Sequence, residues 1–198
     1  MFKAWQHFKT ITHHRMLVCR NCFKVGLYYQ GLPHDLSKYS PTEFRVGAKY
    51  FQGDRSPNNA EREDIGFSTA WLHHKGRNKH HFEYWMDYGV SDGKFGVIPC
   101  PMPRKYIAEL VMDRIAASMV YQGEKYTDSS ALEYFYHGKK LGNVFIHPDT
   151  EKDLEMILKM LAEKGEKETF RFSPTSGIRS NFSSLWTKRL CFPLSWTQ

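Results

Sequence analysis

The sequence Pro33-His34-Asp35-Leu36-Ser37-Lys38 places a histidine and a carboxylate side by side. Imidazole nitrogen suits ions such as zinc, iron, nickel and manganese, and a carboxylate adds a harder oxygen ligand. Both side chains can reach one ion only if the backbone turns between them. The proline before the pair and the Ser-Lys-Tyr-Ser-Pro run after it favour such a turn. The stretch therefore predicts a metal-binding corner, provided that other ligands converge on it.

Histidines are clustered along the chain around this corner. Seven of them form four short groups: His13 and His14, His34, His73 and His74, and His80 and His81. One histidine on an apolar helix face is more often an ordinary core residue than a ligand. Four groups that each place a polar side chain inward need partners, and a shared cation satisfies them together. The competing interpretation is a solvated basic surface, in which Lys75, Arg77 and Lys79 are exposed charges.

Apolar periodicity predicts an all-α protein. Signals for the start of a helix lie at Pro41, in a capping box with Ser40, and at Ser56-Pro57. Glycines at 76 and 165 interrupt or end the helical pattern of apolar residues. The glycine-rich run from 89 to 96 is expected to end the helical pattern that precedes it. The expected helices cover residues 10–30, a short segment from 41, a segment from 56 to 74, 78–88, a segment around 106–120, 128–141 and 148–164.

Composition predicts one domain followed by a tail. The chain has 198 residues, of which 41% are hydrophobic, and this is enough for a substantial core. We expect a metal-binding domain over residues 1–165 and an irregular or docked tail over 166–198. No apolar stretch is long enough to span a membrane, and the first residues lack the apolar middle of a secretory signal, so a cytoplasmic location is expected.

Cysteine usage and charge narrow the chemistry. Cys19, Cys22, Cys100 and Cys191 are too sparse for a disulfide scaffold, and reduced thiols are expected. The formal charge of +7 favours a partner that carries phosphate. The chain contains no Walker or dinucleotide loop and no Gly-x-Ser-x-Gly elbow. The enzyme classes that depend on those motifs are therefore set aside.

Asp113 supplies a second carboxylate of interest. It interrupts the apolar stripe formed by Tyr106, Leu110, Ala117 and Val120 on a predicted helix. A buried carboxylate without a partner is costly, so a cation or a strong hydrogen-bond donor beside it, or a raised pKa of its carboxyl, is expected.

The order of these residues resembles that of the HD-domain superfamily of metal-dependent phosphohydrolases: a helical histidine, a His-Asp pair, two further histidines, and an aspartate on a later helix. More closely, three segments are similar to a family of small HD-like bacterial and phage proteins, and the resemblance covers about residues 10 to 160. The segments are 12–15 (Thr-His-His-Arg), 30–44 (Gln-Gly-Leu-Pro-His-Asp-Leu-Ser-Lys-Tyr-Ser-Pro-Thr-Glu-Phe) and 71–81 (Trp-Leu-His-His-Lys-Gly-Arg-Asn-Lys-His-His). The resemblance implies an HD-domain-like helical bundle with an irregular C-terminal tail.

The resemblance also implies the metal ligands. One ion would be held by His14, His34, Asp35 and Asp113, and a second ion by His74 and His81. Choosing His14 over His13, and His81 over His80, depends on helical phase. The implied cofactor is one or two divalent ions of manganese, iron, zinc, nickel, cobalt or magnesium.

If a metal is present, it lowers the pKa of bound water and offsets charge on a phosphoryl oxygen. Asp35 would then hold the ion or orient the water, and Lys38 would contact a phosphate as a point charge. Arg15, Lys75 and Arg77 are further candidates for substrate contacts, with a role as surface cations as the alternative. Tyr39, Trp71 and Trp85 either stack on a base or pack in the core.

The leading hypothesis is a metal-dependent phosphohydrolase that acts on a nucleotide or a related phosphoester. The expected partner is a small phosphorylated substrate, nucleic acid is possible but not required, and no membrane is involved. A second hypothesis is an HD-type di-iron oxygenase, because a similar His and Asp set can activate dioxygen. A third is a metal-containing binder of anions or nucleic acid without catalysis, which predicts steep salt dependence of binding.

Overall fold

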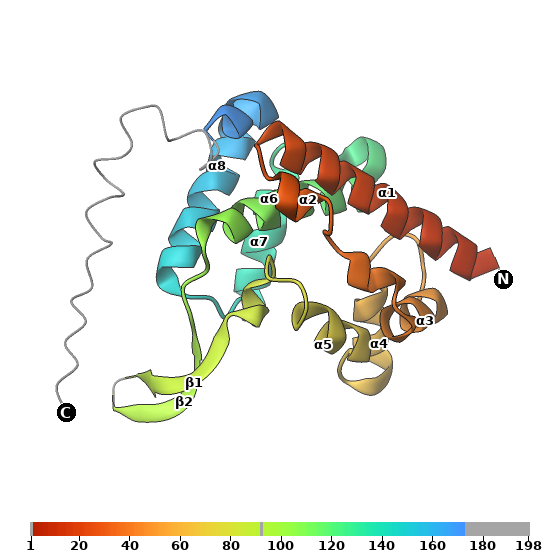
Figure 1. Cartoon of the computed structure of the whole chain (residues 1–198), viewed down its shortest axis with the longest axis horizontal. Coiled ribbons are helices and arrows are strands. Elements are labelled where there is room, and N and C mark those ends of the chain that lie inside the picture. Colours follow the sequence, from red (N-terminus) through yellow and green to blue (C-terminus); the bar gives the residue numbers. More distant parts are fainter. Residues whose placement is uncertain (1, 92, 173–198) are drawn as a thin grey trace.

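The computed structural model describes residues 2–91 and 93–172, and within them the chain is mainly helical with one β-hairpin (Figure 1). The α-helices are α1 (Phe2–Lys24), α2 (Tyr28–Gly31), α3 (Pro41–Lys49), α4 (Pro57–Ile65), α5 (Thr69–Lys75), α6 (Arg104–Gln122), α7 (Ser130–Lys140) and α8 (Pro148–Arg171). Three short 3-10 helices, η1 (Leu36–Tyr39), η2 (Phe82–Tyr84) and η3 (Gly123–Lys125), connect them. The hairpin consists of β1 (Met86–Ser91) and β2 (Lys94–Pro99). The fold is therefore helical but not strictly all-α.

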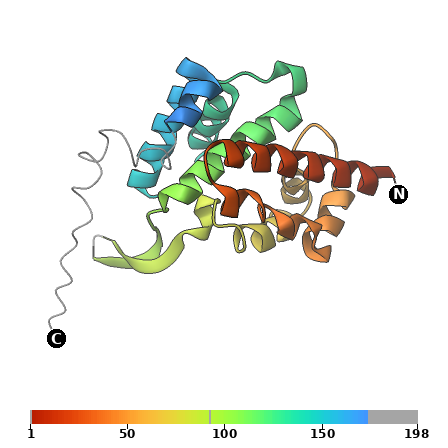
Figure 2. The ribbon, with the colours of Figure 1, turned by 45° about the horizontal axis from the view of Figure 1, so that its top comes forward.

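Helix α6 lies at the centre of the described fold. It packs against α1 on one side and against α7 and α8 on the other, and both views show it between these helices (Figures 1 and 2). Burial of its apolar side chains against these helices contributes to the stability of the fold. The most deeply buried apolar side chains are Val18, Cys22, Val111, Ile115, Ala116, Ala131, Phe135, Leu154, Leu158 and Leu161.

Two expected helices have different boundaries in the structure. The helix expected at 10–30 is α1, which begins at Phe2 and ends at Lys24, because Gly26 adopts a left-handed φ of 76°. The single helix expected from 56 to 74 was wrong. Gly66 ends α4 with a φ of 85°, and the side chain of Ser68 caps α5 by accepting a hydrogen bond from the backbone N–H of Trp71.

The helix expected at 78–88 was also wrong, because this segment contains only η2 and the start of β1. Gly93, with a φ of 74°, lies in the turn between the strands, which pair in the register Tyr88 with Val97 and Val90 with Phe95. These four apolar side chains alternate with the residues of the other face and are all exposed. The hairpin extends away from the helices (Figure 2).

Helix α8 continues beyond the expected end at 164. Gly165 has a φ of 78° and marks a kink instead of a terminus, and helical residues follow it to Arg171. Thr169 is buried there, and Phe170 packs against the core. The remainder of the expected tail, 173–198, lies outside the described residues. No helix in the described part of the chain is both long enough and apolar enough to cross a lipid bilayer.

Candidate metal centre

The His-Asp pair lies at a sharp corner between α2 and η1. Asp35 has a φ of 55° and is the one non-glycine residue with a positive φ in the described chain. This left-handed conformation is uncommon for residues with a Cβ atom, although aspartate adopts it more readily than most. Arg15 of α1 stabilises the corner, because its Nε donates to the carbonyl of His34 at 2.7 Å and its Nη2 donates to that of Leu32 at 3.1 Å. The predicted turn is confirmed.

Four of the predicted ligands converge from three parts of the chain. His14 comes from α1, Asp113 from α6, and His34 and Asp35 from the corner. The Nε2 atom of His14 lies 2.9 Å from Oδ1 of Asp113 and 3.5 Å from Oδ2 of Asp35. The Nε2 atom of His34 lies 3.5 Å and 3.4 Å from the same two oxygens. We call these residues donor set 1.

A second group of donors faces the other oxygen of Asp35. Oδ1 lies 3.2 Å from Nε2 of His74 on α5 and 3.5 Å from Nε2 of His80. The Nε2 atom of His81 lies 3.0 Å from that of His74. We call Asp35, His74, His80 and His81 donor set 2. Asp35 belongs to both sets, with one carboxylate oxygen directed at each.

Both donor sets have dimensions that fit a metal ion. Within each set the donor atoms lie within 4.8 Å of one another. Metal–ligand bonds of about 2.0–2.2 Å place two ligands of one ion at most about 4.4 Å apart, which is close to this limit.

Several of these donor atoms form no regular hydrogen bond. Nε2 of His14, His34 and His80 and Oδ1 of Asp35 are buried and make no hydrogen bond of good geometry among the described residues. Buried polar atoms are rarely left unpaired, and a cation satisfies them together. The residues present therefore fit one ion in each set.

Electrostatics keep the carboxylates of donor set 1 ionised. Burial opposes the charge of Asp35, but His34, Lys38 and His74 together hold its pKa well below the usual range. Burial likewise opposes the charge of Asp113, and the adjacent imidazoles of His14 and His34 hold its pKa well below the usual range. Ionised carboxylates are the form that binds metal.

The histidines of donor set 2 respond differently to burial. Burial and the neighbouring His80 and His74 lower the pKa of His81 well below its usual value, and burial lowers that of His80. For His74, burial is outweighed by Asp35 and Glu43, and its pKa is raised. The lowered pKa values of His80 and His81 favour neutral imidazole, which is the form that ligates a metal.

Two carboxylates outside the donor sets orient the histidines. Oε1 of Glu109 lies 2.9 Å from Nδ1 of His34 and 3.1 Å from Nδ1 of His80, so it contacts one histidine of each set. Oε2 of Glu43 lies 2.7 Å from Nδ1 of His74. A carboxylate on Nδ1 fixes the ring and leaves Nε2 as the metal-binding atom. The sequence reasoning missed both glutamates and also His80.

Lys38 lies directly beside donor set 1. Its Nζ atom is 2.6 Å from Oδ2 of Asp35, and its side chain is 29% exposed, so it borders both the centre and the solvent. Burial opposes its charge, but Asp35 and Asp113 raise its pKa above the usual value, so the ammonium stays charged. The structure places the Lys38 ammonium next to donor set 1. That it contacts a phosphate stays a prediction.

The other predicted substrate contacts have structural partners or lie on the surface. Arg15 is engaged with backbone carbonyls and lies over the Tyr39 ring at 5.3 Å. Arg77 is exposed and donates to the carbonyl of His73, and Lys75 is partly exposed at the end of α5. Among the described residues, Arg15 contacts donor set 1 only through the backbone carbonyl of His34, and neither Arg77 nor Lys75 contacts a donor atom of either set.

The predicted aromatic residues differ in position. The Trp71 ring stacks on the His74 ring, and its centroid lies 4.6 Å from that of the His81 ring, so Trp71 packs beside donor set 2. The Tyr39 hydroxyl pairs with Thr12 at 2.9 Å. Trp85 packs against Tyr106 at the edge of the core, which agrees with the packing alternative.

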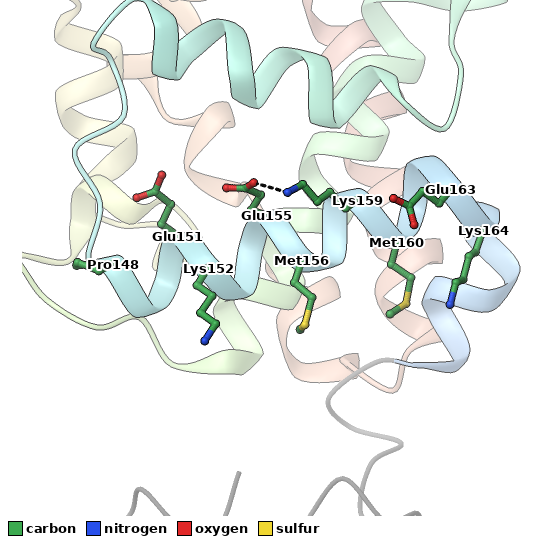
Figure 3. Close-up of a pocket in the computed structure, with 9 residues that line it drawn as sticks. All are labelled: Pro148, Glu151, Lys152, Glu155, Met156, Lys159, Met160, Glu163 and Lys164. Carbon is green, nitrogen blue, oxygen red and sulfur yellow. Dashed lines mark ion pairs between the residues drawn. The ribbon is translucent and has the colours of Figure 1, made fainter. Parts of the chain in front are cut away.

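A surface hollow elsewhere is separate from this centre. Its described lining comes from the outer face of α8, where Met156 and Met160 project beside alternating lysines and glutamates (Figure 3). Glu155 and Lys159 pair there at 2.7 Å. None of the lining residues belongs to either donor set, so the hollow does not mark the candidate site.

Comparison with known proteins identifies the family. No curated protein and no solved structure matches the chain. Residues 3–160 match the model of a family described as a family of unknown function, DUF5662. This segment contains both donor sets, Lys38 and the two orienting glutamates. The chain therefore belongs to the DUF5662 family.

Proposed function

We propose that this protein is a metal-dependent phosphohydrolase with two divalent ions joined by Asp35. The observation that supports it most strongly is the position of that carboxylate, because Oδ2 faces donor set 1 and Oδ1 faces donor set 2. The order of the donors in the chain is also the basis for proposing an HD-like architecture.

The charges around the centre favour an anionic substrate. Held by the two donor sets, a pair of divalent ions would activate water as a nucleophile and would offset the negative charge that develops on a phosphoryl oxygen. Lys38 adds a fixed positive charge at the exposed side of donor set 1, where it can contact a phosphoryl oxygen. The formal charge of +7 adds a general attraction for phosphorylated molecules. A small phosphoester, such as a nucleotide, is the substrate class that these features fit.

Hydrolysis of phosphoesters by the metal-loaded protein tests this function. The full chain is prepared with manganese, and phosphate release is measured from p-nitrophenyl phosphate and from a panel of nucleotides. The expected result is metal-dependent phosphate release that Asp35→Asn abolishes. Asp54→Asn is a matched control, because Asp54 is exposed and belongs to neither donor set. Absence of phosphate release from a protein with two bound ions would contradict the hydrolase.

The same samples distinguish oxygenase chemistry. Protein loaded with iron under anaerobic conditions is exposed to dioxygen, and oxygen consumption is followed with the same substrates. The proposed hydrolase releases phosphate with redox-inert ions and consumes no oxygen. Oxygen consumption that requires iron, without phosphate release from the manganese form, would replace the hydrolase by an oxygenase.

A further inference from the structure

Three aromatic side chains form a continuous row that ends beside the candidate centre. The ring centroids of Trp5 and Phe8 on α1 lie 5.6 Å apart, with an angle of 13° between the ring planes. The Phe8 ring meets the Tyr39 ring edge-on at 5.8 Å. Tyr39 directly follows Lys38, whose Nζ atom lies 2.6 Å from Oδ2 of Asp35. We call Trp5, Phe8 and Tyr39 the aromatic row.

The aromatic row is open to solvent, and its inner end is held in place. Trp5 is 58% exposed, Phe8 is 37% exposed, and Tyr39 is partly exposed. The Tyr39 hydroxyl forms a hydrogen bond with that of Thr12 at 2.9 Å, and Cζ of Arg15 lies 5.3 Å from the Tyr39 ring centroid. Rings in fixed positions can stack on a planar group with little loss of conformational entropy.

The charge around the aromatic row is almost entirely positive. Residues 2–42 contain six Lys or Arg side chains and one carboxylate, that of Asp35. Helix α1 contains five of these cations and no Asp or Glu. One of them, Lys9, lies over the Trp5 ring, with its Nζ atom 6.0 Å from the ring centroid. This segment therefore suits a polyanion.

The length of the aromatic row fits more than one nucleotide. Trp5 lies nine positions before His14 of donor set 1 on α1. At roughly 1.5 Å per residue, this separation is about 13 Å along the helix. Successive nucleotides in one strand of a duplex are about 3.4 Å apart. A strand that extends from the centre to Trp5 therefore contains several nucleotides.

Aromatic rings interleaved with cations are typical of surfaces that bind single-stranded nucleic acid. The cations contact the phosphate backbone, and the rings stack on the bases. A lipid surface also attracts basic and aromatic side chains. The continuity of the aromatic row with Lys38 and donor set 1 favours the strand, because it places the bases and a reacting phosphate along one path.

We propose that the aromatic row binds bases of a single-stranded nucleic acid, one backbone phosphate of which lies at Lys38. This inference rests on the proposed function and narrows its substrate to a phosphodiester of such a strand. In the reaction, the oxygen of water forms a bond to phosphorus, and the bond from phosphorus to one sugar oxygen breaks. That sugar oxygen takes a proton from the water. One fragment then ends in a phosphate and the other in a hydroxyl.

Fluorescence anisotropy with a labelled oligothymidylate of about ten nucleotides tests this inference on the manganese-loaded full chain. Phosphorothioate linkages protect the probe from hydrolysis. Trp5→Ala is expected to weaken binding about tenfold or more, because a stacking contact with a base is lost. Phe95→Ala is the matched control and is expected to bind as wild type does, because Phe95 is a 74% exposed ring on β2, outside the aromatic row.

Two further variants test the charge and the ring separately. Lys9→Gln is expected to reduce the slope of log affinity against log salt by about 0.7, whereas Lys94→Gln on the hairpin leaves it unchanged. Trp5→Phe keeps an aromatic ring and is expected to retain most of the affinity, which also covers the case that Trp5→Ala does not fold. Wild-type affinity in Trp5→Ala, with an unchanged slope in Lys9→Gln, would show that the inference is wrong.

Other occupants of the aromatic row give different results. Binding to vesicles of phosphatidylcholine and phosphatidylserine is measured by sedimentation, and the oligomeric state by analytical ultracentrifugation. If Trp5→Ala loses vesicle binding but keeps oligonucleotide binding, the aromatic row contacts lipid and the inference is wrong. If Trp5→Ala converts a dimer into a monomer and keeps oligonucleotide binding, the aromatic row is a contact between copies, and the inference is again wrong.

Hydrolysis of the unmodified oligothymidylate separates this inference from the proposed function. Trp5→Ala is expected to raise the KM for this strand about tenfold with little change in kcat. Phosphate release from p-nitrophenyl phosphate by a wild type that does not bind the strand overturns the inference but retains the hydrolase. Strand binding that depends on Trp5, without hydrolysis of any phosphoester by the metal-loaded protein, overturns the hydrolase but retains the binding surface.

Discussion

Replacing Glu109 by glutamine is expected to weaken both metal subsites at once. Its Oε1 atom contacts His34 of donor set 1 at 2.9 Å and His80 of donor set 2 at 3.1 Å. Burial opposes the charge of Glu109, but these two histidines hold its pKa below the usual value, so a carboxylate is present. Loss of an orienting carboxylate typically costs 10–100-fold in metal affinity, which is about 1.4–2.7 kcal/mol for each subsite.

Glu43→Gln provides the matched comparison. Glu43 contacts His74 of donor set 2 and the adjacent His73, and neither belongs to donor set 1. This variant is therefore expected to weaken one subsite and leave the other unchanged. Zinc affinities are measured by competition with a fluorescent chelator, and circular dichroism of the metal-free proteins verifies folding. Wild-type affinities in Glu109→Gln, or equal weakening of both subsites in Glu43→Gln, would refute the reasoning.

Three further expectations concern stability and the centre. Gly47→Ala should lower the free energy of unfolding by about 1–3 kcal/mol in urea titration, because a Cβ there would overlap the His7 ring, whereas an unchanged midpoint would contradict this packing. Burial and Lys38 lower the pKa of His7 from 6.5 to about 4. Between these two pH values the unfolded chain binds a proton that the folded chain does not, so the free energy of unfolding should fall by about 3 kcal/mol as the pH falls from 6.5 to 4. His7→Phe should flatten this pH dependence, and an unchanged pH dependence would refute the role of His7. Lys38→Met should lower phosphoester hydrolysis about 100-fold while metal content stays the same, and full activity would remove the proposed phosphate contact.

The sequence predicted the inward-facing donors that lie on regular helices. The resemblance supplied the set of candidate ligands, and helical phase directed His14 and Asp113 inward from the apolar stripes that they interrupt. His80 was missed because residues 78–81 are not helical, so the phase argument did not apply to the His80–His81 pair. Adjacent side chains can both face one centre where the backbone is irregular.

The sequence contains weaker signals for the two orienting glutamates, Glu109 and Glu43. Glu109 lies four residues before Asp113, so the two carboxylates share a helix face, and this spacing was available in the sequence. Glu43 was interpreted only as a capping-box residue. The cap does form, since the side chain of Ser40 accepts from the Glu43 N–H at 3.4 Å, but the Glu43 carboxylate extends to the histidines of α5. Contacts between separate elements depend on packing that local patterns do not encode.

The sequence of the hairpin has the pattern of two strands, but it was interpreted as the end of a helix. Tyr88 and Val90, and then Phe95 and Val97, alternate with other residues at the period of a strand. The glycines between them were taken as a helix stop, although a glycine at the turn also suits a hairpin. The division between α4 and α5 was missed for a similar reason, because Gly66 and Ser68 lie within the single helix that was expected from 56 to 74.

Metal content by elemental analysis tests the shared role of Asp35 most directly. Purified wild type reconstituted with zinc is expected to hold about two ions per chain, His81→Ala and His14→Ala about one each, and Asp35→Ala close to none. Circular dichroism verifies that each variant is folded. An Asp35→Ala protein that keeps the wild-type metal content would contradict a centre built around that carboxylate.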